Sequence, residues 1–249
     1  MKRCFDLLSA FIGLIIFSPL IAIVILLVWL QDFHSPFYLA PRMRRLGVTF
    51  KMVKLRSMVS NADKIGGTST AGTDKRIPWV GRFIRKLKLD EFSQLWNVLI
   101  GDMSLVGPRP QAPFDASLYT EEENRLFEVR PGITDFSSIV FADEGDILAD
   151  AEDPDLLYNQ IIRPWKSRLG IFYVENHSVS LDIKLILLTL IGIVSRSQAL
   201  SGVQNILNNM GADPQLIKVA GRQGELEPFP PPGATKVVEQ LKASSNCKS

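Results

Sequence analysis

An uninterrupted apolar segment near the start of the chain, Leu7 to Leu30, limits its fold more than any other feature. It has 24 residues and no ionisable side chain. As an α-helix it would be about 36 Å long, which is enough to cross the hydrocarbon core of a bilayer. It is apolar on every side, unlike a core helix, and it is longer than the apolar part of a signal peptide and lacks a small-x-small cleavage site. The sequence therefore predicts a membrane anchor.

Ser18 and Pro19 lie near the middle of this segment. Proline removes a backbone donor and clashes with the preceding turn, so the helix should bend or break there. Basic residues flank the segment on both sides, with Lys2 and Arg3 before it and an arginine cluster from Arg42 to Arg45 after it. The positive-inside rule favours the cytoplasm for both flanks, which a re-entrant helix satisfies. An ordinary kinked crossing is the alternative, because the downstream cluster could outweigh two residues.

The net charge of +2 conceals an asymmetry between two parts of the chain. Asp32 to Arg109 contains 14 Lys and Arg against 6 Asp and Glu, a net of +8, whereas Pro110 to Ser249 contains 12 against 19, a net of −7. A basic region after a membrane segment indicates anionic headgroups or phosphorylated ligands, or simple retention in the cytoplasm. The two cysteines and two histidines form no disulfide framework or zinc pattern, which favours a reducing compartment.

The pattern after the anchor predicts an α+β fold, a compact and mainly helical domain with a small sheet and interfacial amphipathic helices. Residues 50–58 alternate apolar and basic residues, which indicates a strand with one cationic face. The Gly-, Ser- and Thr-rich stretch 61–73 is typical of a loop. Apolar residues recur at helical spacing from Phe92 to Leu99, and Gly101 should stop that helix. Leu181 to Val194 is too short for a comfortable crossing and is either a core helix or a helix lying on the bilayer.

Three regions follow from this reading. Residues 1–31 form the re-entrant membrane helix, broken at Ser18-Pro19. Residues 32–200 form the cytoplasmic domain. Residues 201–249 form a C-terminal extension that we expect to be largely disordered after about residue 221, because it is rich in proline and glycine and then polar.

Asp90 and Glu91 are the centre of chemical interest. Two carboxylates at a helix start can simply complement the helix dipole. Here, however, Arg85, Lys86 and Lys88 precede them and Arg109 lies between two prolines shortly after. Mg²⁺ usually takes one or two carboxylates and completes its shell with phosphate oxygens and water, while arginine matches phosphate geometry. The group therefore indicates a site for a divalent metal and a phosphorylated ligand, and an aspartate can also attack phosphorus.

Three stretches in this region closely resemble the bacterial sugar transferase family, the monotopic polyprenyl-phosphate phosphoglycosyl transferases. They are GRFIR at 81–85, LDEFSQLWNVL at 89–99 and GDMSLVGPRP at 101–110. Further matches are FSP at 17–19, KLRSM at 54–58 and VRPGIT at 129–134. The resemblance runs from about Lys2 to Ser197, and the short length is similar to the minimal small form of the family.

The resemblance implies transfer of a phosphosugar from a UDP-sugar to undecaprenyl (polyprenyl) phosphate, with release of UMP, through a covalent phosphoglycosyl-Asp intermediate. Asp90 would be the nucleophile, Glu91 would help to bind Mg²⁺ together with Asp90, and Arg85 and Arg109 would hold phosphate oxygens, with Lys54 and Arg130 as weaker candidates. The family's Ser-Pro motif breaks a re-entrant helix that dips into one leaflet, so the domain would face the cytoplasm at the inner membrane. As further partners we expect membrane lipids and a second copy of the chain, in a homodimer, and we expect no nucleic acid.

The sequence departs from the common family pattern after Thr134, where Asp135-Phe136-Ser137-Ser138 replaces Gly-Trp-Ala-Gln. We expect the following segment, Val140 to Asp155, to bear on the choice of sugar. Two other functions stay open from the residues: a non-catalytic membrane scaffold for glycan assembly enzymes, and a phosphatase of lipid diphosphates that would need an activated water.

Overall fold

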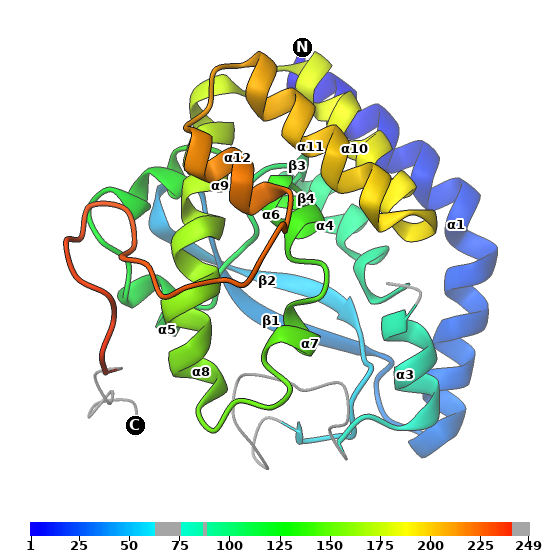
Figure 1. The fold of residues 1–249 in the computed structure, drawn as a ribbon. Coiled ribbons are helices and arrows are strands. Elements are labelled where there is room, and N and C mark those ends of the chain that lie inside the picture. Colours follow the sequence, from blue (N-terminus) through cyan, green and yellow to red (C-terminus); the bar gives the residue numbers. More distant parts are fainter. Residues whose placement is uncertain (63–75, 87–88, 241–249) are drawn as a thin grey trace.

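The computed structural model describes residues 1–62, 76–86 and 89–240, and within this part the chain is rich in helices and has two small two-stranded sheets (Figure 1). Most of the expected loop at 61–73, together with Lys88, lies outside the described residues. The principal helices are α1 (Lys2–Asp32), α3 (Trp79–Lys86), α4 (Gln94–Ile100), α5 (Pro113–Ser117), α6 (Phe136–Val140), α7 (Glu144–Ile147), α8 (Pro154–Leu157), α9 (Arg163–Asn176), α10 (Val179–Val194), α11 (Arg196–Asn209) and α12 (Pro214–Ala220). The strands are β1 (Phe37–Arg44), β2 (Val48–Leu55), β3 (Ser104–Val106) and β4 (Gly132–Thr134). The shorter turns of helix are η1 (Arg45–Gly47), η2 (Leu89–Glu91), η3 (Glu123–Glu128) and η4 (Tyr158–Ile162).

The predicted apolar helix is α1, and in the described part of the chain it is the one helix long and apolar enough to cross a membrane. It continues without interruption through Ser18 and Pro19, so the predicted break is absent, although its two halves run in different directions (Figure 1). Pro19 cannot donate to the carbonyl of Ile15, four residues earlier. The Ser18 hydroxyl donates to that carbonyl instead, at 2.8 Å. This bond satisfies the acceptor that proline leaves open and explains why the helix can continue.

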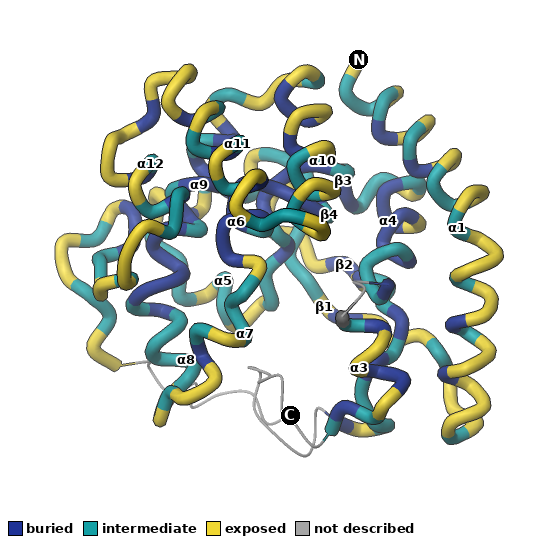
Figure 2. The backbone as a smooth tube through the Cα atoms, turned by 45° about the vertical axis from the view of Figure 1, so that its right-hand side comes forward, coloured by how far each residue is buried: buried dark blue, intermediate teal, exposed yellow. Residues whose placement is uncertain are grey.

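Both ends of α1 are joined to the rest of the chain by charged side chains. Near its start, Lys2 donates to the buried Asp182 of α10 at 2.6 Å, and Asp6 accepts from the backbone N–H of Leu105 at 3.1 Å. At its other end, Asp32 pairs with Arg56 just after β2, with 2.5 Å between the Asp32 Oδ1 and Arg56 Nη2 atoms. Between these ends, most residues of α1 are exposed (Figure 2), and most of the large ones among them are apolar. The helix therefore lies along the domain and presents an apolar outer side.

The β1–β2 hairpin is antiparallel and pairs Phe37 with Leu55 at its open end. The strand predicted over residues 50–58 is confirmed for residues 50–55, where β2 ends, but the prediction of one cationic face is wrong. Side chains alternate between the two faces of a strand, so Lys51 and Lys54 lie on opposite faces. Lys54 shares its face with the buried Phe50 and Met52, while Lys51 is exposed.

The main core lies where α6, α9, α10, α11 and α12 meet. Its fully buried members include Phe136, Leu169, Leu185 and Leu207. A second, smaller core joins α1 and α4 to the hairpin through Ala10, Met52, Val98 and Met103. The short parallel pair of β3 and β4 lies between the two cores, with Ser104 opposite Gly132.

Helix α10 was expected either in the core or on the bilayer, and it combines features of both. Leu181 and Leu185 are buried, whereas the large apolar side chains on its other side are exposed. The exposed ones are Ile183, Leu187, Leu190, Ile191, Ile193 and Val194. Only one side of α10 is thus covered by the domain.

Residues 221–240 differ from the predicted disorder. They contain no helix or strand, as their proline content implies, but they pack on α9. The ring of Phe229 stacks on Trp165 with centroids 4.6 Å apart, and Arg168 donates to the carbonyl of Pro230 at 2.9 Å. These contacts hold an irregular backbone in place without regular secondary structure.

Candidate active site

Most residues that the sequence singled out for chemistry line one cleft of about 830 Å³. Strand β2, helix α3 and turn η2 provide one side of it, and residues 142–146 with η4 and α9 provide the other. The predicted residues in its lining are Lys54, Arg85, Asp90, Glu91 and Arg109. The fold therefore brings together four separate sequence stretches that each resemble the same family.

Asp90 and Glu91 lie in η2, not in the first turn of the following helix as the spacing predicted. The chain turns once more before α4 begins at Gln94, and Gly101 ends that helix with a φ of 96°, as expected from its position. The Ser93 hydroxyl lies 3.0 Å from the carbonyl oxygens of both Asp90 and Val53. Ser93 thereby links η2 to β2 and holds the two carboxylates beside Lys54.

Asn97 makes the second connection between α4 and β2. Its buried side-chain amide donates to the carbonyl of Lys51 at 3.0 Å and accepts from the N–H of Val53 at 2.8 Å. Ser93 and Asn97 are four residues apart and so lie on one side of the helix. The predicted amphipathic pattern covered only the apolar residues and missed this polar contact.

Arg109 reaches the cleft from the turn that follows β3. A Cβ atom added at Gly107 would lie 2.3 Å from the carbonyl oxygen of Arg130, and one added at Gly132 would lie 2.1 Å from the N atom of Gly107. Only glycine permits two backbones to approach this closely. The glycines therefore set the path of the Gly-Pro-Arg-Pro stretch and the place of Arg109.

Arg109 and Glu91 form an ion pair, with Nη2 and Oε1 2.9 Å apart. The charge of Glu91 raises the pKa of Arg109, more than burial lowers it. An arginine has five N–H donors, so this guanidinium can bind Glu91 and a phosphate at once. The pair fixes the guanidinium of Arg109, which stays positively charged, in the lining of the cleft.

Asp90 and Lys54 each influence the pKa of the other. Burial raises the pKa of Asp90, and the nearby Lys54 charge opposes that rise. Burial also lowers the pKa of Lys54, to about 8, with the Arg109 charge acting in the same direction. Desolvation disfavours each charge alone, so each is stabilised mainly by its neighbours of opposite sign.

The other two predicted phosphate ligands are placed differently. Arg85 lines the cleft, and its Nε donates to the Ser57 hydroxyl at 3.0 Å. Arg130 does not line it, because its Nε donates to the carbonyl of Gly101 at 3.0 Å, at the end of α4. The position of Arg130 thus supports a role in holding α4 and not the predicted phosphate contact.

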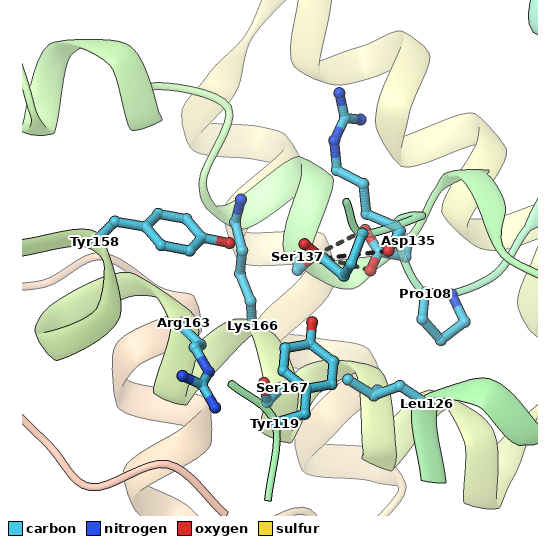
Figure 3. A pocket seen from close by; sticks show the side chains of 11 residues that line it. Pro108, Tyr119, Leu126, Asp135, Ser137, Tyr158, Arg163, Lys166 and Ser167 are labelled. Carbon is cyan, nitrogen blue, oxygen red and sulfur yellow. Dashed lines mark hydrogen bonds between the residues drawn. The ribbon is translucent and has the colours of Figure 1, made fainter. Parts of the chain in front are cut away.

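Two cations in the cleft were not predicted. Arg42 of β1 lines the cleft, although its position in the arginine cluster had an adequate explanation as a membrane-flanking charge. Lys166 of α9 pairs with Glu144 and lies 5.3 Å from the ring centroid of Tyr158, and Figure 3 shows the lysine beside this tyrosine. Lys166 stands outside any recognisable motif, so the sequence carried no signal for it.

The departure from the family pattern after Thr134 has a structural consequence. The buried Asp135 caps α6 and accepts from the N–H of Ser138 at 2.7 Å. It also accepts from the Ser137 hydroxyl, and Figure 3 shows this contact. Phe136 is fully buried in the main core. This stretch therefore starts the helix that leads into residues 142–146, on the side of the cleft opposite Asp90.

The arrangement fits the usual binding mode of Mg²⁺. No group of three or more His, Cys, Asp or Glu residues suited to a metal occurs in the described chain, but Asp90 and Glu91 offer two adjacent carboxylates. Mg²⁺ typically uses one or two carboxylates and takes its remaining ligands from phosphate and water. The cleft therefore suits a metal that arrives with a phosphorylated substrate.

Comparison with known proteins agrees with this site. The model of the family described as "Bacterial sugar transferase" matches residues 1–196. An uncharacterized sugar transferase from Bacillus subtilis (strain 168) is 37% identical over 189 residues, which cover 76% of this chain and 85% of that protein. A UDP-N-acetylgalactosamine-undecaprenyl-phosphate N-acetylgalactosaminephosphotransferase from Aeromonas hydrophila is 33% identical over 192 residues, 76% of this chain and 42% of that protein. An undecaprenyl-phosphate glucose phosphotransferase from Komagataeibacter xylinus is 35% identical over 76% of this chain and 35% of its own length.

Proposed function

This chain belongs to the bacterial sugar transferase family, and we propose that it transfers a sugar phosphate from a UDP-sugar to undecaprenyl or another polyprenyl phosphate. Because the chain spans less than half of the Aeromonas and Komagataeibacter relatives, their activities serve here as support for the proposal. The reaction would release UMP and start a lipid-linked glycan. It would take place at the cytoplasmic side of the inner membrane.

One observation carries the proposal: a partly buried carboxylate, Asp90, faces a cleft that also holds Lys54, Arg85 and Arg109. A diphosphate has several oxygens to neutralise, and planar guanidinium groups suit them. A carboxylate in a phosphate site repels the anionic ligand, so its presence there is best explained by a chemical role. Attack on phosphorus is such a role for Asp90.

In the first step, an oxygen of Asp90 forms a bond to the phosphorus that bears the sugar. The bond between that phosphorus and the bridging oxygen breaks, and UMP leaves with the bridging oxygen and its electron pair. Asp90 must be ionised for this step; burial raises the pKa of its carboxyl group, and the nearby Lys54 charge favours ionisation by opposing that rise. Arg85 and Arg109 stabilise the charge that grows on the phosphoryl oxygens.

In the second step, a phosphate oxygen of the polyprenyl phosphate attacks the same phosphorus. The bond to Asp90 breaks, and the products are the free carboxylate and a polyprenyl diphosphate sugar. Two bulky substrates can then use one phosphate site in turn. A Mg²⁺ ion held by Asp90 and Glu91 would add positive charge at the phosphoryl oxygens.

We place the sugar of the donor against residues 142–146, which line the cleft opposite Asp90. This wall follows the stretch that departs from the common family pattern. Tyr158 and Lys166 adjoin it and offer an aromatic ring and polar groups for a sugar. The choice of sugar would depend on this wall.

We propose that α1 is re-entrant, with Ser18 and Pro19 at its deepest point in the bilayer. The contacts of Lys2 with Asp182 and of Asp32 with Arg56 tie both ends of α1 to one polar domain. A helix that crossed the bilayer would separate its ends by a hydrocarbon layer of about 30 Å, which a polar domain cannot enter. Both ends, and with them the active site, would therefore lie on one side of the membrane, and the basic residues that flank α1 favour the cytoplasmic side. The exposed apolar face of α10 would rest on the same membrane surface.

Release of UMP from a panel of UDP-sugars, with and without polyprenyl phosphate, tests this function. We expect one or a few donors to yield UMP and a lipid diphosphate sugar. A non-catalytic scaffold would release UMP from none of them. A phosphatase would release inorganic phosphate from lipid diphosphates without any sugar donor.

A further inference from the structure

A second cleft, of about 530 Å³, adjoins the active site. The two clefts share one set of lining residues: Glu91, Arg109, Ala142, Glu144 and Lys166. From this shared end the second cleft extends between β4, α6, α10 and α11, and we refer to it as the α10 groove. Glu91 and Arg109 thus line both clefts, whereas the residues that the sequence singled out pointed only to the larger one.

The chemistry of the α10 groove changes along its length. The shared end carries two ion pairs, Arg109 with Glu91 and Lys166 with Glu144, and the N–H groups of both cations that remain can bind an anion. Away from this end, apolar side chains line the groove together with Thr134, Ser138, Thr189 and Arg196. Its apolar lining consists of Ile133, Ile139, Phe141, Ile193 and Ala199. A ligand that matches it has an anionic head and an apolar chain.

The far part of the groove reaches the exposed apolar side of α10. Ile193 lines the groove and is also 68% exposed, so it stands at the groove's outer end. Next to it, Gly192 keeps this part open, because an added Cβ there would already lie 3.4 Å from the Ala199 Cβ. The neighbouring Val194 is exposed and does not line the groove.

We infer that the α10 groove binds the acceptor lipid, with its phosphate at Arg109 and Lys166 and its first isoprene units between α6 and α10. This inference rests on the proposed function and gives the acceptor's isoprene chain a binding site of its own. The groove is too small for a whole polyprenyl chain, so the remainder of the chain passes Ile193 into the bilayer. The donor occupies the larger cleft, and after UMP leaves, the acceptor phosphate enters the shared phosphate site beside Asp90 while its isoprene chain lies in the α10 groove.

Ile193→Asp tests the inference, with Val194→Asp as the matched control on the same exposed helix. The full-length protein is placed in lipid nanodiscs. The donor step is followed alone, as exchange of labelled UMP into the UDP-sugar without acceptor. Complete transfer is then measured with undecaprenyl phosphate and with a phosphate that carries a single isoprene unit.

We expect Ile193→Asp to leave UMP exchange within twofold of wild type and to raise the KM for undecaprenyl phosphate at least tenfold. Wild type and Ile193→Asp should use the single-isoprene acceptor equally well, because its chain does not reach Ile193. Val194→Asp should change neither the KM for undecaprenyl phosphate nor the KM for the donor by more than twofold. Equal losses in the two variants would overturn the inference in favour of a general effect on membrane contact, and a raised donor KM in Ile193→Asp would assign the groove to the donor. If wild type shows no UMP exchange with any UDP-sugar, the proposed function fails, a result that differs from every groove-specific one.

Discussion

Arg109 donates a 2.9 Å hydrogen bond to Glu91, in the part of the cleft that borders the α10 groove. The pair joins a turn shaped by close glycine contacts to the carboxylate next to Asp90. Because Glu91 already fixes the guanidinium, its remaining N–H groups need little reorganisation when a phosphate binds. Arg109 is therefore the cation in the cleft whose loss should cost most.

Arg109→Met should lower kcat/KM by about 10²- to 10³-fold, the usual cost of removing one preorganised donor to a reacting oxygen. Arg130→Met is the matched control, because the sequence made both arginines phosphate candidates and the structure separates them. We expect Arg130→Met to lower thermal stability while leaving kcat/KM within a few-fold of wild type. Similar losses of activity in both variants would contradict this placement.

The lowered pKa of Lys54, about 8, sets an expectation for the pH profile. Below pH 8 the side chain is a cation that attracts the donor diphosphate, and above it the charge disappears. Since kcat/KM reports groups of the free enzyme, it should fall as pH rises through about 8. Lys54→Arg should remove this alkaline limb, because arginine stays charged at these pH values.

The same lysine also acts on the acidic limb. Burial raises the pKa of Asp90 and Lys54 opposes that rise, so Lys54→Met should move the acidic limb of kcat/KM to higher pH. A profile of Lys54→Met whose acidic limb coincides with that of wild type would show that the two groups do not interact.

Asn97 should contribute strongly to stability, because its buried amide serves two backbone groups of β2. Asn97→Ala leaves those groups without this partner, at a cost of about 1–3 kcal/mol for each one that stays buried. Thermal unfolding in detergent measures the effect, with the exposed Asn208→Ala as the control. A melting temperature unchanged from wild type would mean that α4 is not held to β2 in this way.

Local patterns predicted several features well. The apolar run gave α1, and Gly101 ended α4 as its place in the pattern indicated. The residues of the motif around Asp90 line one cleft together, because they are close in sequence. These features depend on neighbours within one or two helical turns, which sequence shows directly.

Features that depend on distant contacts were missed or misread. Lys166 enters the cleft only because α9 packs beside it, and Arg130 turns away because the end of α4 offers it a carbonyl. The proline-rich segment after residue 221 packs on Trp165 and Arg168, which periodicity cannot reveal. Lys51 and Lys54 were assigned to one face because the charge pattern was given more weight than the two-residue period of the strand.

The topology of α1 can be checked with a cysteine placed before Lys2, in a chain whose native cysteines are replaced by serine. A membrane-impermeant maleimide should label it in inverted vesicles and not in intact spheroplasts. Asn208→Cys, on the exposed surface of α11, reports the side of the domain. Labelling of the two positions from opposite sides would contradict a re-entrant helix.

The central claim is that Asp90 carries the phosphosugar between donor and acceptor, and mass spectrometry of the intact protein and its peptides tests it most directly. After incubation with its UDP-sugar and no acceptor, the wild-type chain should release one equivalent of UMP and gain the mass of the sugar phosphate on the peptide containing Asp90. Addition of polyprenyl phosphate should remove that mass, and Asp90→Asn should show neither UMP release nor the adduct. An Asp90→Asn protein that turns over near the wild-type rate would contradict the account.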